Sequence, residues 1–560
     1  MPSDRFEAHI EYAKLLWAQE DHRAAIHALD SFVPNGLLKY LQSKAKQAVT
    51  PAGNSNLSAT DEILGKATLL QTRWMEASGY ANGLEIRERY DLISKVHSKW
   101  EKAHYYMAKY HQHVYESQLL LDPSTRTSES HFGDYVTIIV RSYIISLQFG
   151  FKYVYETLPK LITLWLEFST KVDVVDLQSH EADQSKIVQK VIESRRSNLA
   201  AINRLLERYS VRVPSYLFYI ALPQLFSRLL HHDSKVYHVI QMIIVHVTRT
   251  HPRQALWLLF AAVNSDRKER KERGDDLVKK LLSTPATLPS SQNFGLSQTF
   301  TPNSDAMTQT NIKSLVNSAT KVTKELKNLS RAPVDKKQRR LRLSDLGFDS
   351  SCVPTGLVLP VAQCMCITFP SQSAAMKYHT AFPKNSMITI ESLDNYCEAM
   401  LSLQRPKKIA LIGSNGRRYR ILCKDKDDVR KDARLNELTR SIDSLLKKDP
   451  MASKRKLGIC TYWVTPLSED GGLIEWVEGV KPLREILVEN YRARGCNTNF
   501  STIGQGLPPL EKYRAFIKYY RPVLKFWFIE NFPEPSSWID ARTKYGRTLA
   551  VMSIIGFILG

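Results

Sequence analysis

The stretch Lys408-Ile-Ala-Leu-Ile-Gly-Ser-Asn-Gly-Arg-Arg-Tyr-Arg-Ile-Leu-Cys-Lys424 decides the fold of the last third of the chain. Two apolar runs flank Ser-Asn-Gly, and Asn-Gly between strand-like runs is a strong signal for a hairpin. Cys460–Pro466 and Gly472–Val477 supply two further strand-like runs. Helical patterns return in three later segments, Pro482–Arg492, Leu510–Ile529 and Trp538–Gly560. We therefore predict an α+β part, in which a small sheet is followed by helices.

Before this part, the pattern is helical up to about residue 282. Ala13, Leu16 and Trp17 fall on one stripe, and a second short amphipathic segment follows a polar break. Such helix pairs are the unit of tetratricopeptide-type solenoids. In four later helical segments, apolar residues cover more than one face of the helix: Tyr135–Phe149, Leu161–Phe168, Tyr216–Leu230 and Val236–Val247. Helices of that kind pack between other helices, so we predict a layered superhelix and a mostly α chain.

Composition marks the boundaries between five regions. Residues 283–312 are rich in Ser, Thr, Pro and Gln and poor in aliphatic residues, which predicts a disordered linker. The predicted regions are a helical domain over 1–282, the linker over 283–312, a basic helical connector over 313–350, a sheet region over 351–480 and a helical region over 481–560.

The chain is basic, with 78 Lys and Arg against 56 Asp and Glu and a net charge of +22 over 560 residues. The excess is spread along the chain, with local runs only at Arg267–Arg273 and Lys336–Arg342. A spread excess is more typical of solvated helix faces than of a dedicated DNA groove. We therefore expect no direct, specific nucleic-acid site.

The seven cysteines all lie at or beyond Cys352, and their spacing does not fit a zinc site. An odd number of cysteines without zinc spacing favours reduced thiols in an intracellular compartment and no bound metal. The N-terminus has no apolar signal core, and Leu549–Gly560 is shorter than the ~20 residues that a membrane span needs. We expect no membrane partner.

Two patterns in the sheet region suggest nucleotide chemistry. Lys424 ends a predicted strand and is followed by the acid-rich run Asp425–Asp432, as in kinases, where a strand lysine pairs with phosphates and a carboxylate holds it. By itself this pattern is more typical of a solvated sheet edge. Leu473–Val477 could be a hinge whose backbone reads adenine, although in isolation an ordinary buried strand explains it better.

Taken together, three motifs resemble the phosphatidylinositol-kinase-related protein kinases, and among them the ATR type, the DNA-damage checkpoint kinases. The motifs are Lys424-x(7)-Asp432, Leu473-Ile-Glu-Trp-Val477 and Trp538–Gly560. Trp100–Tyr110, Leu158–Trp165 and His251–Trp257 resemble the FAT domain of that family. The resemblance implies a FAT-type α-helical solenoid over 1–282, a protein-kinase-like N-lobe with its hinge over 351–480, and the first helices of a C-lobe over 481–560.

The resemblance also implies an ATP site on the predicted sheet. Residues 402–408 would cover the phosphates, Lys424 would contact them and Asp432 would hold Lys424, while Gly413–Gly416 would be only the hairpin turn. Leu422 would pack on the base, and Glu475–Val477 would form the hinge. Trp476 would stack on adenine, or else be a core aromatic. The site residues so assigned are Met400, Ser402, Pro406, Leu422, Lys424, Asp432, Tyr462, Ile474, Glu475, Trp476 and Val477, with Tyr462 and Ile474 at the back of the pocket.

Catalysis needs more than this site. Phosphoryl transfer requires a catalytic-loop Asp, an Asn and a metal-binding Asp-Phe-Gly. In the family these follow the run that ends here at Gly560, and the chain holds no substitute. We expect the catalytic residues and the Mg²⁺ ligands outside this chain, and we predict that the chain alone is inactive. The resemblance further implies protein substrates, a regulatory partner subunit that binds upstream of this chain, a dimer of the full-length kinase, and a nuclear location.

Three dipeptides in the linker match the sites that such kinases phosphorylate. Ser291, Ser297 and Thr308 are each followed by Gln. Compositional bias alone would produce such pairs, and this explanation is the stronger one. Three alternatives to the kinase remain open: a non-catalytic scaffold or pseudokinase of the same architecture, a phosphoinositide lipid kinase, and a nucleic-acid-binding helical protein. Lys424 and Asp432 argue against the first, and the helical clasp argues against the second.

Overall fold

The computed structural model describes residues 2–31, 33, 36–48, 58–120, 132–172, 184–283, 309–335, 338–383, 385, 387–400, 404–455, 457–480, 483–496, 506–520, 523–531 and 533. The chain divides into two compact units. The helical unit comprises Met1–Thr320 and Cys366–Met387, and the sheet unit comprises Lys321–Met365 and Ile388–Gly560.

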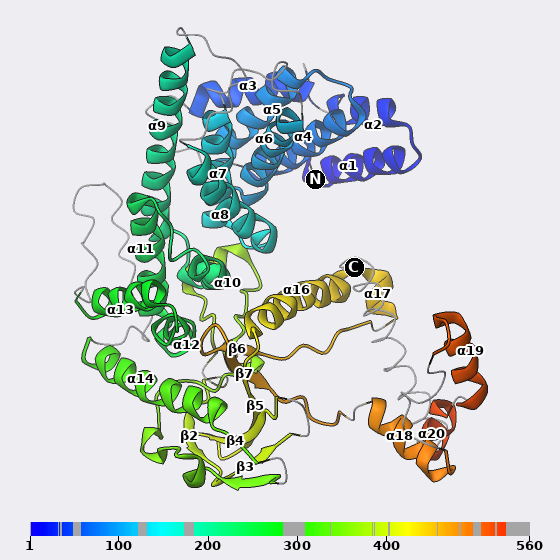
Figure 1. The fold of residues 1–560 in the computed structure, drawn as a ribbon. Helices are drawn as coiled ribbons and strands as arrows, with labels where there is room; N and C mark the ends of the chain where they lie inside the picture. The colour runs from blue at the N-terminus through cyan, green and yellow to red at the C-terminus, as the bar shows by residue number, and fades with distance from the viewer. Residues whose placement is uncertain are drawn as a thin grey trace. The chain divides into compact units, whose positions relative to one another are not determined.

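The helical unit is a succession of helices, most of which contact the next helix along the chain, whereas α9 contacts α7, α8 and α11 (Figure 1). Its helices are α1 (Pro2–Ala18), α2 (His22–Asp30), α3 (Gly36–Ala48), α4 (Ala59–Ser78), α5 (Gly83–Val96), α6 (Glu101–Leu120), α7 (Phe132–Phe149), α8 (Val154–Lys171), α9 (Gln184–Ser210), α10 (Ser215–Phe226), α11 (Ser234–Thr250), α12 (Pro252–Val263) and α13 (Lys268–Ser283). The predicted helical segments Tyr135–Phe149, Leu161–Phe168 and Val236–Val247 lie within α7, α8 and α11, whereas the helix predicted over Tyr216–Leu230 ends at Phe226, before a turn.

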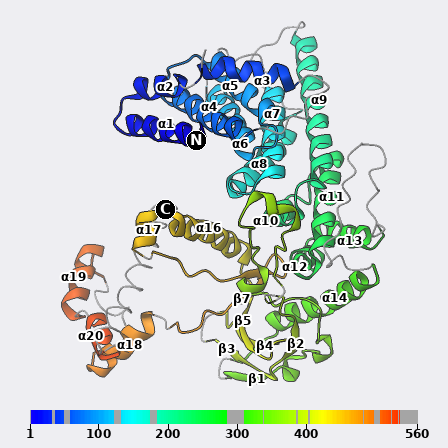
Figure 2. The ribbon, with the colours of Figure 1, turned by 180° about the vertical axis from the view of Figure 1, so that it is seen from behind.

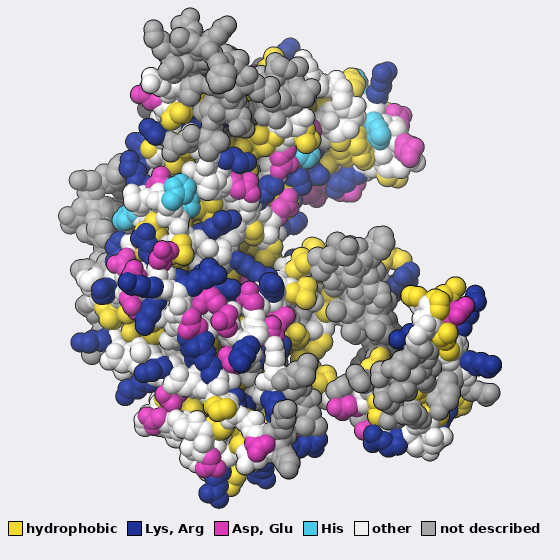
Figure 3. Space-filling view, viewed as in Figure 1, with side chains coloured by type: hydrophobic (Ala, Val, Ile, Leu, Met, Phe, Trp, Pro, Cys, Tyr) yellow, Lys and Arg dark blue, Asp and Glu magenta, His cyan; other side chains and the backbone are white. Residues whose placement is uncertain are grey.

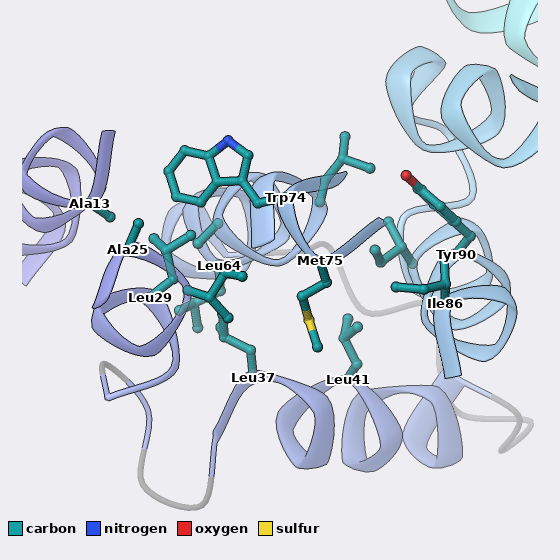
Figure 4. Close-up of a cluster of buried hydrophobic side chains, with 14 of the residues drawn as sticks. Ala13, Ala25, Leu29, Leu37, Leu41, Leu64, Trp74, Met75, Ile86 and Tyr90 are labelled. Carbon is teal, nitrogen blue, oxygen red and sulfur yellow. The ribbon is translucent and has the colours of Figure 1, made fainter. Parts of the chain in front are cut away.

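The first five helices enclose one apolar core. Figure 4 shows side chains of α1 to α5 that point toward one another, among them Leu37 and Leu41 from α3 and Met75 from α4. Trp17 of α1 stacks on Trp74 of α4, with ring centroids 4.7 Å apart and planes only 3° from parallel. The predicted pair α1–α2 therefore does not stand alone, because α4 covers it.

The apolar helices α8, α10, α11 and α12 bury more than half of their residues, as their composition predicts. Trp165 of α8 and Trp257 of α12 are fully buried, and the indole N–H of Trp165 donates to Asn203 Oδ1 of α9 at 2.9 Å. Large aromatic side chains bury 150–250 Å² each, so such residues dominate the energetics of a helical core.

Cys366–Met387 belongs to the helical unit, although the sequence placed it in the sheet region 351–480. Phe369 stacks on Phe151 with centroids 5.2 Å apart, and Phe382 meets Tyr219 edge to face at the same distance. The segment carries little regular structure beyond a 3-10 turn at Ser373–Tyr378. Its aromatic side chains, rather than any periodic pattern, determine where it packs.

The sheet unit is built on seven antiparallel strands: β1 (Arg340–Arg342), β2 (Ile390–Leu393), β3 (Tyr396–Ala399), β4 (Lys407–Gly413), β5 (Arg418–Asp425), β6 (Val464–Pro466) and β7 (Gly471–Glu475). Their order is β1-β3-β4-β5-β7-β6, and β2 also pairs with β4. The helices of this unit are α15 (Ala362–Met365), α16 (Val429–Lys448), α17 (Pro450–Lys454), α18 (Leu483–Ala493), α19 (Pro509–Tyr519) and α20 (Leu524–Asn531) (Figure 2). The boundary between the two units falls within α14 (Gln309–Arg331).

The predicted hairpin is confirmed. β4 pairs with β5 from Lys407–Cys423 to Ile412–Arg418, and Gly416 adopts a left-handed φ of 74° in the turn. Glycine enters that region without the steric cost that a Cβ brings, which is why Asn-Gly turns are typical of hairpins. Gly413–Gly416 is therefore a turn and not a phosphate-binding loop.

Further predicted boundaries differ from the structure. α14 begins at Gln309, so the last four residues of the predicted linker are helical, and residues 284–308 lie outside the described residues. The connector 313–350 is not helical throughout, because β1 joins the sheet by pairing with β3. The helix predicted over Leu510–Ile529 is two helices, α19 and α20, and Pro522, which cannot continue a helix, stands between them in the sequence. Trp538–Gly560 lies outside the described residues.

Charges are mixed on the surface. On the face shown in Figure 3, Lys and Arg side chains are interspersed with Asp and Glu over the described residues. Within the described ranges, no helix combines the length and the apolar character that crossing a bilayer requires.

Candidate functional site

One face of the β4–β5–β7 sheet carries three of the predicted nucleotide residues, Leu422, Lys424 and Ile474. The register aligns Lys408 of β4 with Leu422 of β5, and Leu422 with Ile474 of β7, so the three side chains share a face. All three are half-buried, whereas Ile421 and Cys423 on the other face are fully buried. The sheet therefore has a core face and a second face that is open to a ligand.

Lys424 lies at the end of this open face, where β5 is about to end. Its Nζ pairs with Asp427 Oδ2 at 2.7 Å, and both side chains are partly exposed. The sequence assigned this role to Asp432, whereas in this structure the carboxylate that pairs with Lys424 is that of Asp427. The reason is local: the chain turns at Lys426, which has a left-handed φ of 57°, and this turn returns Asp427 to the lysine. Asp432 is half-buried in the first turn of α16.

The carboxylate of Glu475, at the end of β7, is hydrogen-bonded within the protein. Glu475 Oε2 accepts the backbone N–H groups of Ala362 and Trp463, each at 2.8 Å. Burial raises the pKa of Glu475, and the two backbone hydrogen bonds oppose that shift. The carboxylate thus ties the end of β7 to two other segments and fixes the path of the chain after it.

Trp476 follows on the open face. The backbone N–H of Trp476 donates to Arg420 O at 3.0 Å, and the ammonium of Lys408 lies 4.8 Å from the centre of the indole ring. The indole is half-buried, so it is not the fully buried core aromatic of the alternative interpretation. Among the described residues, the N–H of the next residue, Val477, has no hydrogen-bond acceptor. A backbone N–H beside an aromatic ring can donate to an acceptor on a flat ligand.

Two hydrogen bonds involve the described residues before β4. Met400 N–H donates to Pro406 O at 2.9 Å, and both residues are half-buried. Gln404 Nε2 donates to Lys426 O at 3.2 Å, which links this segment to the turn after β5. Ser402 lies outside the described residues, and Tyr462 is half-buried in the segment that leads to β6.

A cavity of about 270 Å³ opens on the same sheet beside Lys408. Its lining includes Tyr396 and Glu398 of β3, Ala410 of β4 and Arg420 of β5. Lys408 Nζ also pairs with Glu398 Oε2 at 2.5 Å. Sequence reasoning missed Lys408 as a residue of the open face and Asp427 as the partner of Lys424. The alternation along β4 could have indicated the first, and the three-residue spacing from Lys424 the second.

The remaining predicted site residues lie outside what can be described. Ser291, Ser297 and Thr308 fall in residues 284–308. In the described part of the chain, no three His, Cys, Asp or Glu side chains gather as ligands for a metal ion.

Three family models match the chain. Residues 2–163 match the FAT domain, residues 201–302 match "Serine/threonine-protein kinase ATR-like, HEAT repeats", and residues 418–560 match "Phosphatidylinositol 3- and 4-kinase". The last match begins at the first residue of β5 and includes Lys424 and the end of β7.

Several curated proteins are similar over the whole chain. Protein kinase rad3 of Schizosaccharomyces pombe is 32% identical over 572 residues, which cover 100% of this chain and 23% of that protein. Serine/threonine-protein kinase ATR of Oryza sativa subsp. indica is 29% identical over 600 residues, covering 99% of this chain and 21% of the relative. Serine/threonine-protein kinase MEC1 of Candida albicans is 27% identical, covering 99% and 22%. The chain thus spans less than a quarter of the length of these relatives.

Solved structures share the fold. "FAT and kinase domain of CtTel1" matches with a TM-score of 0.68 and 16% identity, over 98% of this chain and 37% of that one. "Structure of the open conformation of CtTel1" matches with a TM-score of 0.67. The predicted fold class, a FAT-type helical solenoid followed by a kinase-like N-lobe and the first C-lobe helices, is confirmed by these matches.

Proposed function

Because the chain belongs to the phosphatidylinositol-kinase-related protein kinases of the ATR type, we propose that its sheet unit forms the ATP-binding N-lobe of a DNA-damage checkpoint Ser/Thr kinase. The helical region over 1–282 is then its FAT region, and residues 481–560 begin its C-lobe. The N-lobe starts within α14 rather than at residue 351, because β1 already belongs to the sheet.

One observation carries the proposal: Lys408, Leu422, Lys424 and Ile474 share the open face of a sheet whose other face is buried. An ammonium beside apolar side chains suits a ligand with a charged end and a flat apolar end. Lys424 binds the phosphates and is oriented by Asp427 in the nucleotide-free chain.

The base is bound at the other end of the same face. Leu422 and Ile474 pack on adenine, Trp476 stacks on it, and the backbone of Glu475–Val477 reads its edge. Met400, Ser402 and Pro406 line the phosphate side, Tyr462 lies toward the back, and Asp432 stays a predicted site residue in α16. Mg²⁺ bound with ATP would neutralise developing charge on the phosphates, and its ligands are expected outside this chain.

The finer functional statements rest on the relatives. Since those proteins are named Ser/Thr kinases, we propose protein substrates with Ser/Thr-Gln sites, a nuclear location, and a regulatory partner subunit that binds upstream of this chain. "Complete CtTel1 dimer with C2 symmetry" is a similar structure, which supports a dimer of the full-length kinase. The 560-residue sequence contains no Asp-Phe-Gly, so we propose that this chain alone transfers no phosphate to a Ser-Gln peptide.

Titration of the 560-residue chain with ATP and with adenosine tests the site. Lys424→Met should weaken ATP binding by about 10-fold or more, because hydrogen bonds to charged groups contribute about 1.5–3 kcal/mol, and should leave adenosine binding unchanged. Lys431→Met, at an exposed position of α16, is the matched control and should change neither affinity. Unchanged ATP affinity in Lys424→Met, or an equal loss in Lys431→Met, would contradict the proposal.

A further inference from the structure

Not every basic residue of the run Arg405–Lys408 faces the proposed nucleotide. Lys407 is only 3% exposed and lies on the core face of β4, opposite to Lys408. Its Nζ donates to Ser330 O of α14 at 2.8 Å. The last four carbonyls of a helix have no N–H partner within the helix, and a cation is favoured at that end. Lys407 therefore satisfies a carbonyl in the last turn of α14.

Two further contacts join the end of α14 to the same edge of the hairpin. Arg405 Nη2 donates to Gln338 O, a few residues beyond α14, at 2.6 Å. Arg331, the last residue of α14, approaches Asp425 at the end of β5, with Nε and Oδ1 3.6 Å apart. The end of α14 and the residues after it thus contact Arg405 just before β4, the first residue of β4 and the last residue of β5.

Backbone conformation at this edge shows that it is constrained. Arg405 and Lys426 both have left-handed φ angles, 45° and 57°, which residues other than glycine rarely adopt. The two lie at the adjoining ends of β4 and β5, and Gln404 Nε2 bonds Lys426 O between them. Such conformations persist only where the surroundings impose them, and they gather at ligand-binding sites.

We propose that the end of α14 is a clamp that sets the position of Gln404–Lys408 and of Lys424, and that Lys407 is its principal positioning residue. The α14 clamp consists of Ser330, Arg331 and Gln338, which hold Lys407, Asp425 and Arg405 respectively. Neither Lys407 nor Arg405 binds the nucleotide; both act through the segment that they fix. The proposal rests on the proposed function only in assigning phosphates to the neighbouring face.

The clamp makes nucleotide affinity depend on α14. A shift of the last turn of α14 would move the segment before β4 and the end of β5 together, since both are attached to it. The boundary between the helical and sheet units falls within α14, between Thr320 and Lys321. The clamp residues of α14, Ser330 and Arg331, therefore belong to the sheet unit, as do the segments that they hold.

Amide hydrogen exchange of the 560-residue chain tests the clamp without any nucleotide. Lys407→Met keeps the length of the side chain and removes the ammonium. It should accelerate exchange at Met400 and Lys407 by about 10-fold or more, and it should leave the hairpin near Ile412 unchanged. Lys407→Arg, which can still donate to Ser330 O, should restore most of the protection. Cys423→Ala, at the buried cross-strand neighbour of Lys407, is the control for lost packing and should affect the whole hairpin evenly.

Unchanged exchange before β4 in Lys407→Met, or an even loss along the hairpin as in Cys423→Ala, would overturn the clamp. If Lys407→Met does not fold, Arg405→Met at a half-buried position provides the same comparison. Titrations with ATP and adenosine then separate the two proposals. We expect ATP affinity to fall several-fold and adenosine affinity to hold. Faster exchange with both affinities unchanged would support the clamp and contradict the placement of the phosphates.

Discussion

Glu475 offers a quantitative test of how the hinge is built. Glu475→Ala removes the oxygen that accepts the N–H groups of Ala362 and Trp463. An unsatisfied buried donor costs about 1–3 kcal/mol. Both donors are partly buried, so water reaches them in part and the lower end of that range applies. We expect a loss of about 1 kcal/mol at each amide, or about 5-fold faster opening of these two amides.

The charge of Glu475 is separable from its hydrogen bonding. Glu475→Gln keeps an oxygen in the place of Oε2 and removes a charge that burial disfavours, so we expect it to lie within about 1 kcal/mol of the wild type at pH 7. Burial raises the pKa of Glu475 above its usual 4.5. A carboxyl group whose pKa is higher in the folded than in the unfolded chain stabilises the fold at pH values below its unfolded-state pKa. This contribution disappears as pH rises through its folded-state pKa. Wild type should therefore gain stability relative to Glu475→Gln as pH falls from 7 toward 4.5.

Hydrogen exchange read by mass spectrometry on peptides that contain Ala362 and Trp463 measures both effects. The reasoning is refuted if Glu475→Ala and Glu475→Gln accelerate exchange equally, because the two variants differ in the acceptor oxygen. It is also refuted if only one of the two peptides responds to Glu475→Ala, because both amides share Oε2.

Three further predictions concern other parts of the chain. Asp427→Asn should make Lys424 more reactive toward an amine acylating reagent, and Asp432→Asn should not. Peptide mass spectrometry measures the labelling of Lys424. Greater labelling in Asp432→Asn than in Asp427→Asn would show that Asp432 is the partner of Lys424, as the sequence indicates. Burial lowers the pKa of His251 to about 4, so the helical unit should lose stability as pH falls from 6.5 toward 4. The thermal midpoint should fall less over this pH range in His251→Gln than in the wild type. An equal fall in both proteins would contradict this role of His251. At pH 8, iodoacetamide should label the exposed Cys460 and spare Cys423, since burial raises the pKa of the Cys423 thiol to about 12; equal labelling would show that β5 opens readily.

The sequence predicted those parts of the fold that local patterns determine. Asn415-Gly416 between two apolar runs predicted the β4–β5 hairpin, and the position of Lys424 at its end followed from the length of the second run. The continuous apolar segments predicted the buried helices, because a helix of that composition has no polar face to expose.

The parts that sequence reasoning missed depend on contacts between distant residues. Arg340–Arg342 is a short basic segment, and only its pairing with Tyr396–Glu398 makes it a strand. Cys366–Met387 has no periodicity, and its aromatic contacts with Phe151, just before α8, and with Tyr219 of α10 assign it to the helical unit. The pair Lys424–Asp427 depends on the left-handed turn at Lys426, for which no glycine gave a signal.

The most direct test of the account labels the phosphate site itself. An ATP analogue with an acyl phosphate transfers its acyl group to a lysine amine beside the bound phosphates, and the nucleotide leaves as the phosphate. With the 560-residue chain, mass spectrometry should find Lys424 labelled, and excess ATP should suppress that labelling while excess adenosine suppresses it less. Labelling that ATP does not suppress, or that falls equally on the exposed Lys431, would contradict the claim that this sheet face binds ATP.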